Sequence, residues 1–341
     1  MIVSSAPGRC GIVGNPTDMY GGSVISCSTA ERAHCALVES RGLVVCVDRF
    51  REEIRTADDL KLTGTHLDIP KAILNYFGLT PDNFGFRLQA SSDVPERAGL
   101  AGSTAMVVAI LGGVLAQLGI EADRYYIAET ARRVEFGVMG IMCGYQDQHM
   151  AAFGGLNYMD FRGKESLTQE PDEPLATVEP LDALVGAPPI VVAHTGITRN
   201  SGTVHKSIRE RWLEGEREVV EGYLRIAELA RLGKKAMLAG DWETLGDLMN
   251  ENHAIQRGLG GSGPQNDFLI ETALENGAIG AKLAGAGKGG TIVALTLEPD
   301  RTVRALRAAG AQRILWPRPV DGLTVEATWQ HQLLPEAAGS A

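Results

Sequence analysis

The feature that most constrains this chain is a glycine-rich loop that runs directly into a long apolar helix. The loop 95–105 contains Gly99 and Gly102, and residues without a Cβ let the backbone turn tightly and approach a ligand. Apolar residues then recur at helical spacing, which predicts a helix over 105–118. Free N–H groups and the positive end of the helix dipole meet at such an N-terminus, which suits a polyphosphate. A plain turn with Ser103 as the N-cap fits the same residues.

The spacing of the glycines excludes two common nucleotide-binding motifs. No Gly-Lys-Ser/Thr follows a glycine five positions back, so the loop is not a Walker loop. A second glycine run has the pattern G-x-G-x-x-G at Gly285, Gly287 and Gly290. A dinucleotide-binding fold needs a strand before these glycines and a helix after them, whereas here we expect a helix before and a strand after. The second run is therefore predicted to be a glycine hairpin, or a surface packed near a ligand.

Length and charge bound the possible functions. The 341 residues are enough for about two domains, and a formal net charge of −10 argues against a general nucleic-acid binder. The apolar runs are far shorter than the ~20 residues that a membrane span requires, and the first residues lack a signal-peptide pattern. Five cysteines without a C-x-x-C pair predict neither disulfides nor structural zinc. We expect a cytoplasmic protein with no nucleic-acid or membrane partner, as a monomer or homodimer.

The pattern of the first half predicts a mostly antiparallel sheet covered by helices. The expected strands are 11–14, 23–27, 36–38, 42–47, 85–90 and 156–161, and the expected helices are 69–77, 105–118 and 123–138. Glu135 lies near the end of the last helix, where a carboxylate opposes the helix dipole and needs a partner such as a metal ion. A polar, acidic, proline-containing stretch at 164–189 predicts the domain boundary.

The second half alternates strands and helices, which indicates an α+β sandwich. A strand at 189–194 precedes charged amphipathic helices that reach about residue 257. A helix at 266–275, a strand at 291–295 and a last strand near 323–329 follow.

Three glycine-rich segments, at 8–22, 95–105 and 284–290, resemble the three motifs of the GHMP small-molecule kinases. The resemblance covers nearly the whole chain and implies a two-domain α+β fold. It implies an N-terminal domain like ribosomal protein S5 domain 2 over 1–175, a ferredoxin-like α/β sandwich over 176–335 and a tail at 336–341. Gly102 stands where the family usually has serine. Asn15-Pro16 replaces the Glu-His of the galactose-kinase motif, which puts galactose in doubt.

The resemblance also implies the roles of individual residues in ATP- and Mg²⁺-dependent phosphoryl transfer. Asp147 matches the catalytic aspartate, and Arg9 is expected to stabilise the transferred phosphoryl group. Glu135 and Ser103 match the Mg²⁺ ligands. The nucleotide-binding candidates are Pro95, Arg97, Gly99, Leu100, Ala101, Gly102, Ser103, Thr104, Gly285 and Gly287. The substrate-binding candidates are Asn15, Thr17, Asp18, Tyr20, Gly144, Arg199, Ser201 and His205.

Two segments narrow the substrate. The residues 14–22, together with 201–212, look like those of glucuronokinase-like sugar-1-kinases, which implies transfer to the anomeric hydroxyl of glucuronate. Heptose kinases and other sugar-1-kinases share parts of this pattern. A sensor that binds the sugar without turning it over, and a decarboxylase of the mevalonate branch, use the same fold. We expect a kinase, because Asp147, Glu135 and Ser103 are all present.

Overall fold

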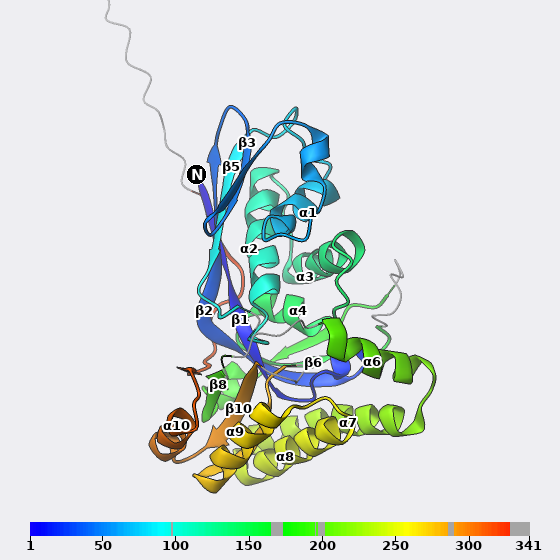
Figure 1. Ribbon diagram of the computed structural model, residues 1–341, viewed down its shortest axis with the longest axis vertical. Coiled ribbons are helices and arrows are strands. Elements are labelled where there is room, and N and C mark those ends of the chain that lie inside the picture. The colour runs from blue at the N-terminus through cyan, green and yellow to red at the C-terminus, as the bar shows by residue number, and fades with distance from the viewer. Residues whose placement is uncertain (97, 165–172, 195, 197–201, 286–289, 328–341) are drawn as a thin grey trace, which may run out of the picture.

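Two β-sheets, each with its own helices, organise the chain (Figure 1). The computed structural model describes residues 1–96, 98–164, 173–194, 196, 202–285 and 290–327, and for 202–207 the backbone alone. The loop candidates Arg97, Arg199, Ser201 and Gly287 lie outside the described residues, as does the side chain of His205.

The larger sheet has eight strands and is mostly antiparallel, as predicted. Its main path runs β12-β1-β2-β5-β3-β4, with β6 paired to β2 and β7 paired to β6. Only β3 and β5 pair in parallel among the registered strands of this sheet. The strands are β1 Ile2–Val13, β2 Ser23–Glu39, β3 Leu43–Val47, β4 Phe50–Ile54, β5 Phe86–Ser92, β6 Leu156–Asp160, β7 Thr177–Pro180 and β12 Thr324–Ala327.

Four helices cover one face of this sheet (Figure 1). They are α1 Asp68–Tyr76, α2 Gly102–Gln117, α3 Arg124–Arg133 and α4 Gln146–Phe153, with short 3-10 turns at Thr17–Tyr20 and Ala57–Leu60. In α2, twelve consecutive residues from Thr104 to Leu115 are buried. A helix that is apolar on all sides belongs in a core, and α2 accordingly packs between the sheet and the other helices. The core therefore fixes the position of the loop that precedes α2.

The sequence pattern divided the first strands too finely. Residues 23–27 and 36–38 were expected as separate strands, but β2 is one continuous strand of 17 residues. Its polar middle, 28–32, has no alternating pattern and pairs with β1 at Ser28 and Arg32, while β6 and β5 pair with the residues before and after it. The pairing of β1 with β2 shifts register between Pro7 and Arg9 and between Gly11 and Val13. Such irregularities re-aim side chains, and here they flank Arg9.

The smaller sheet has four strands in the order β11-β8-β10-β9, all antiparallel. They are β8 Ile190–His194, β9 Ala278–Leu283, β10 Thr291–Thr296 and β11 Arg313–Leu315. The helices are α5 Asp182–Val185, α6 Gly202–Leu213, α7 Arg217–Ala239, α8 Trp242–Gly258, α9 Pro264–Glu275 and α10 Pro299–Ala308. Helices separate β8 from β9 and β10 from β11, which gives the β-α-β-β-α-β order of a ferredoxin-like sandwich. Within the described residues, no helix combines the length and the apolar character needed to cross a membrane.

The predicted domain limits need a correction. The second domain was expected to span 176–335, but β7 and β12 both pair with strands of the larger sheet. β12 returns to β1, with Ile2 opposite Ala327. A sequence pattern identifies a strand but not its partner, so the return of the chain to the first sheet was not foreseen.

Candidate active site

A cavity of about 250 Å³ lies where the first turn, the loop before α2 and the end of β9 meet. It brings together most of the predicted site residues. Those that line it are Arg9, Asn15, Asp18, Gly99, Ala101, Gly102, Ser103, Thr104, Glu135, Gly144, Asp147 and Gly285.

Among the predicted residues that the structure describes, four do not line this cavity. The Thr17 hydroxyl donates to the carbonyls of Gly14 and Ser23, 2.7 and 3.2 Å away, so it braces the turn from within. The Tyr20 ring packs against Trp212 and Tyr223, with centroids 4.7 and 4.9 Å apart. Leu100 is buried in the core below the loop, and Pro95 lies at the start of the loop.

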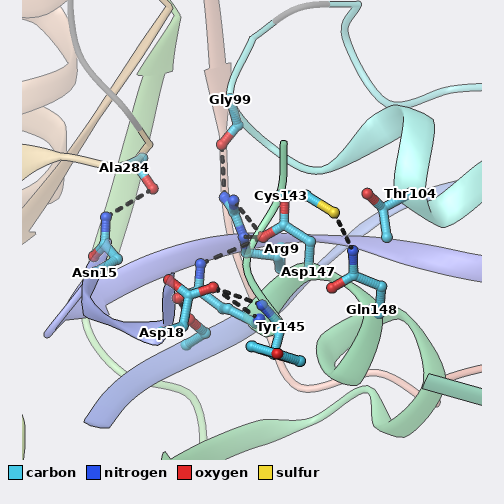
Figure 2. A network of polar contacts seen from close by, with 12 residues as sticks. Arg9, Asn15, Asp18, Gly99, Thr104, Cys143, Tyr145, Asp147, Gln148 and Ala284 are labelled. Atoms are coloured by element: carbon cyan, nitrogen blue, oxygen red, sulfur yellow. Dashed lines mark hydrogen bonds and ion pairs between the residues drawn. The ribbon is translucent and has the colours of Figure 1, made fainter. Parts of the chain in front are cut away.

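Arg9 and Asp147, which both line the cavity, form an ion pair (Figure 2). Arg9 Nη2 lies 2.6 Å and Nε 2.8 Å from Asp147 Oδ1. Arg9 Nη1 donates to the Gly99 carbonyl at 2.6 Å, so one guanidinium links the loop before α2 to α4. The Arg9 side chain is 7% exposed and that of Asp147 is 31% exposed. The arginine is therefore fixed, and the carboxylate remains open to a molecule in the cavity.

Glu135 also lines the cavity, from a π-helical turn at Val134–Val138 that follows α3. Such turns are rare and occur frequently at functional sites. The carboxylate accepts hydrogen bonds from Thr104 Oγ1 at 2.8 Å and from Gln148 Nε2 at 2.5 Å. Burial raises the pKa of Glu135 to about 7, against the lowering effect of these two donors. Among the described residues no cation lies within ion-pair distance of Glu135.

Two neighbouring hydroxyls lie at the start of α2. The one in contact with Glu135 is that of Thr104, and the role of Ser103 as a second Mg²⁺ ligand stays a prediction. Ser103 is exposed and lines the same cavity. The two residues are consecutive at the start of α2, so sequence spacing alone could not distinguish them.

Asp18 binds the N-terminus of α4. Its Oδ2 accepts from the backbone N–H groups of Tyr145 and Gln146 at 2.9 and 3.0 Å (Figure 2). Burial raises the pKa of Asp18 to about 6, partly offset by these two amides. A Cβ on Gly144 would lie 2.0 Å from Asp18 Oδ2, so the contact requires a glycine there. The Asp18 contact thus orients the helix that carries Asp147.

The loop before α2 is more than a plain turn. The N-cap of α2 is Ala101, in the left-handed region with φ 59°, and it makes no side-chain capping bond. The interpretation of Ser103 as the N-cap is therefore wrong, because Ser103 is already within the helix. Uncapped N–H groups at a helix start favour an anion, and Ala101 to Thr104 line the cavity.

The second glycine run touches this loop. A Cβ on Gly285 would lie 3.1 Å from the Gly99 carbonyl oxygen, so the two backbones can approach only without it. The strands on either side of the run, β9 and β10, pair antiparallel, with Leu283 opposite Ile292. The strand after the run was predicted and the strand before it was not, and the glycine run between them lies largely outside the described residues.

Two residues in contact with the site were missed. Gln148 holds Glu135, and Lys282 on β9 donates to Asn15 Oδ1 at 2.8 Å. A lysine at a buried position of an otherwise apolar strand was a signal that could have identified Lys282.

A larger hollow of about 410 Å³ lies beside α8 and α9, and two of its polar residues have structural partners. Asn250 bonds the backbone of Ile279 and Ala281, and Arg257 lies within ion-pair distance of Asp267 and Glu271. The pair of cavity-facing carboxylates and the arginine are found at the smaller cavity, which we regard as the active site.

Comparison with known proteins agrees with this geometry. The family description "GHMP kinases N terminal domain" matches residues 66–155, and "GHMP kinases C terminal" matches residues 234–312. A mevalonate kinase of Pyrococcus horikoshii is 34% identical over 71% of this chain and 69% of its own length. A protein described as probable glucuronokinase 2 of Arabidopsis thaliana is 29% identical over 87% of this chain and 85% of its own.

A solved structure shares the fold. The D-glycero-D-manno-heptose 1-phosphate kinase from Bacteriodes thetaiotaomicron superimposes with a TM-score of 0.74 at 22% identity, covering 97% of this chain and 100% of its own. The matched segments include the loop before α2, Glu135 and Asp147. The chain belongs to the GHMP kinases and is a phosphotransferase with an alcohol group as acceptor.

Proposed function

We propose that this protein is an ATP-dependent sugar 1-kinase that converts glucuronate to glucuronate 1-phosphate. The observation that carries the proposal is a single cavity lined by Asp147 with its partner Arg9, by Glu135 and by the uncapped start of α2. Phosphoryl transfer requires in-line positioning and charge stabilisation rather than covalent chemistry from the protein. The two walls supply these functions separately.

On the acceptor wall, Asp147 is the group that orients the attacking hydroxyl and receives its proton. Its carboxylate is partly exposed to the cavity and is held by Arg9. The fixed guanidinium also places positive charge beside the site of transfer, where negative charge develops. Asp18, whose Oδ1 is not used by α4, is the proposed acceptor for sugar hydroxyls.

On the opposite wall, the uncapped N–H groups from Gly102 onward receive the phosphates of ATP. The donor set there fits Mg²⁺, which takes oxygen ligands and only one or two carboxylates. Glu135 and the hydroxyls of Ser103 and Thr104 supply such oxygens, and the buried Gln148 Oε1 beside them has no hydrogen-bond partner. The ion would neutralise charge on the β- and γ-phosphates. Among the described residues there is no group of three His, Cys, Asp or Glu to hold a metal more fully.

The likeness to the Arabidopsis protein supports glucuronate as the acceptor. It extends across both domains, and the segments 14–22 and 201–212 carry the sequence resemblance described above. Arg199, Ser201 and His205 stay predicted contacts of the uronate. The alternative is a heptose, which the solved heptose 1-phosphate kinase of the same fold supports.

A direct assay tests the proposal. Purified protein is incubated with ATP, Mg²⁺ and one of glucuronate, galacturonate, glucose, mannose or a mannoheptose with or without a 7-phosphate, and ADP release is measured. Phosphorus NMR of the product then shows whether the phosphate is on the anomeric carbon. We expect the highest kcat/KM with glucuronate. A higher kcat/KM with the heptose or with a neutral hexose refutes glucuronate as the substrate. If no acceptor in the set supports ADP release, a sensor that binds the sugar without phosphorylating it is favoured.

A further inference from the structure

Lys282 is a buried lysine that the proposed chemistry does not use. It lies on β9, and its side chain is inaccessible to solvent. Its Nζ donates to Asn15 Oδ1 at 2.8 Å and to the carbonyl of Leu283. No carboxylate of the described residues lies within ion-pair distance. A buried ammonium without a counter-charge is costly, and burial lowers the pKa of Lys282 to about 7. Its presence calls for a role beyond stability.

The partner of Lys282 is a residue that was expected to bind substrate. The Asn15 side chain turns toward β9, where its Nδ2 lies 3.4 Å from the Ala284 carbonyl, while Asp18 in the same turn reaches toward Tyr145 (Figure 2). Asn15 also packs against Gly11, where a Cβ would lie 2.5 Å from Asn15 Oδ1. Both ends of its amide are therefore engaged by the protein. Asn15 fixes the turn that carries Asp18.

The end of β9 also meets the nucleotide loop. Gly285 follows Ala284 directly and lies against Gly99. Thr291, at the start of the next strand, bonds the carbonyl of Ala98. Lys282 thus lies three residues before the point at which the second domain contacts the loop preceding α2. The Lys282 side chain therefore links two regions. One is the end of β9, which contacts the loop before α2, and the other is the turn that carries Asn15 and Asp18.

We propose that Lys282 is a positioning residue that holds Asn15. Through Asn15 it fixes the turn that carries Asp18 against the end of β9, and so positions Asp18 for the acceptor. This inference rests on the proposed kinase function. Asn15 then acts on the substrate through the shape of its turn. Replacing either partner releases the same constraint, so the two replacements should not have independent effects.

The test is a double-mutant cycle with Lys282→Met and Asn15→Leu. We expect each single variant to raise the acceptor KM and lower kcat, with a loss of about tenfold or more in kcat/KM, because small misplacements at a reacting centre are costly. The double variant should be no worse than either single variant. The KM for ATP should change by less than about threefold, since the Gly285 and Gly99 backbones still meet.

Two further variants separate positioning from stability. Lys71 is another buried lysine, whose Nζ lies 2.8 Å from Glu52 Oε1 in the first domain away from the cavity. Lys71→Met should lower Tm and leave both KM values unchanged. Asn15→Asp keeps an acceptor for Lys282 and should retain most of the acceptor affinity. In the Lys282→Met background, Asn15→Asp places a buried carboxylate without a cation, and the affinity for the acceptor should be lost.

The outcomes are decisive for the inference. It is overturned if Lys282→Met changes Tm alone, as Lys71→Met does, or if the losses of the two single variants multiply in the double variant. Should Lys282→Met fail to fold, Asn15→Leu and Asn15→Asp carry the same comparison. Urea unfolding of the four proteins of the cycle requires no substrate. Additive changes in the free energy of unfolding refute the coupling of Lys282 to Asn15, even if the protein is an active kinase. Inactivity of the wild type toward every acceptor refutes the proposed function and leaves this coupling unaffected.

Discussion

The two carboxylates of the cavity, Asp147 and Glu135, have opposite surroundings. Asp147 is 31% exposed and has a guanidinium 2.6 Å away. Glu135 is 2% exposed and is held by one hydroxyl and one amide. The charge of Asp147 is therefore neutralised by the protein itself. Among the described residues no cation lies within ion-pair distance of Glu135, and burial raises its pKa to about 7.

This difference indicates which carboxylate needs a ligand. A buried acidic group without a cation is destabilised in its charged form and gains from a metal ion. An exposed carboxylate that is already paired gains little from one and is free to contact an acceptor. The same chemical change at the two positions, from carboxylate to amide, should therefore have different consequences.

The largest expected effect is that of Asp147→Asn. The amide cannot receive the proton of the attacking hydroxyl and loses the ion pair with Arg9, so we expect kcat to fall by about 1000-fold. Tm should fall as well, because the buried Arg9 guanidinium loses its counter-charge and keeps only neutral acceptors, the amide oxygen and the Gly99 carbonyl. Steady-state ADP release and thermal unfolding measure the two effects. A kcat within tenfold of the wild type would exclude Asp147 as the catalytic base.

Glu135→Gln should have the next largest effect and the opposite effect on stability. We expect kcat to fall by roughly 100-fold, and the Mg²⁺ concentration needed for half-maximal rate to rise, because a charged ligand is lost. Tm should stay or rise, since the change removes a buried charge and leaves an acceptor for Thr104. A magnesium titration of the rate and thermal unfolding without metal test this. A fall in Tm equal to that of Asp147→Asn would show that the two carboxylates are not held differently.

The helices and the sheet types were predictable from local pattern, but strand partners were not. The apolar periodicity at 105–118 located α2 to within three residues, because a helix needs only its own sequence. The pairing of β12 with β1 joins residues more than 300 positions apart, and nothing in either strand specifies the other. The polar middle of β2 likewise depends on its pairing with β1 and not on a pattern of its own.

The composition of the site was predictable, whereas its internal contacts were not. The resemblance to the GHMP kinases assigned Arg9, Asp18, Glu135 and Asp147 to one site, and all four line one cavity. Their partners depend on side-chain direction, which spacing does not give. The choice of Thr104 instead of Ser103 at Glu135, and the turn of Asn15 toward Lys282, are both of this kind.

A third prediction concerns the wall that holds Glu135. A Cβ on Gly102 would lie 3.2 Å from Val94 Cγ1, and a valine there would displace the first turn of α2 into the cavity. We expect Gly102→Val to raise the KM for ATP by about tenfold or more, with a smaller change in the acceptor KM. Isothermal titration with a non-hydrolysable ATP analogue measures the affinity directly. Unchanged affinity would mean that the loop before α2 does not bind the phosphates.

The smallest effect concerns α4, which serves both walls because Asp147 and Gln148 are adjacent on it. On the same helix His149 is fully buried, with Nδ1 2.8 Å from the Tyr145 carbonyl. Burial lowers the pKa of His149 to about 4. The unfolded chain, with a histidine pKa near 6.5, binds more protons than the folded chain between these values. The stability associated with neutral His149 is therefore complete above about pH 6.5 and is lost as the pH falls toward 4.

The variant His149→Asn keeps a donor for the Tyr145 carbonyl and does not titrate, so it isolates this contribution. We expect the free energy of unfolding to fall between pH 7.5 and 5.5 by about 1 kcal/mol more in the wild type than in the variant. Asp18, whose pKa is raised to about 6, acts in the opposite direction, since its contribution is lost as the pH rises through 6. Asp18 is present in both proteins, so its effect cancels in the difference. Urea unfolding of each protein at the two pH values gives the four free energies. Equal losses of unfolding free energy in the two proteins would show that His149 is not held neutral in α4. Acid would then not destabilise, through His149, the helix that carries Asp147 and Gln148.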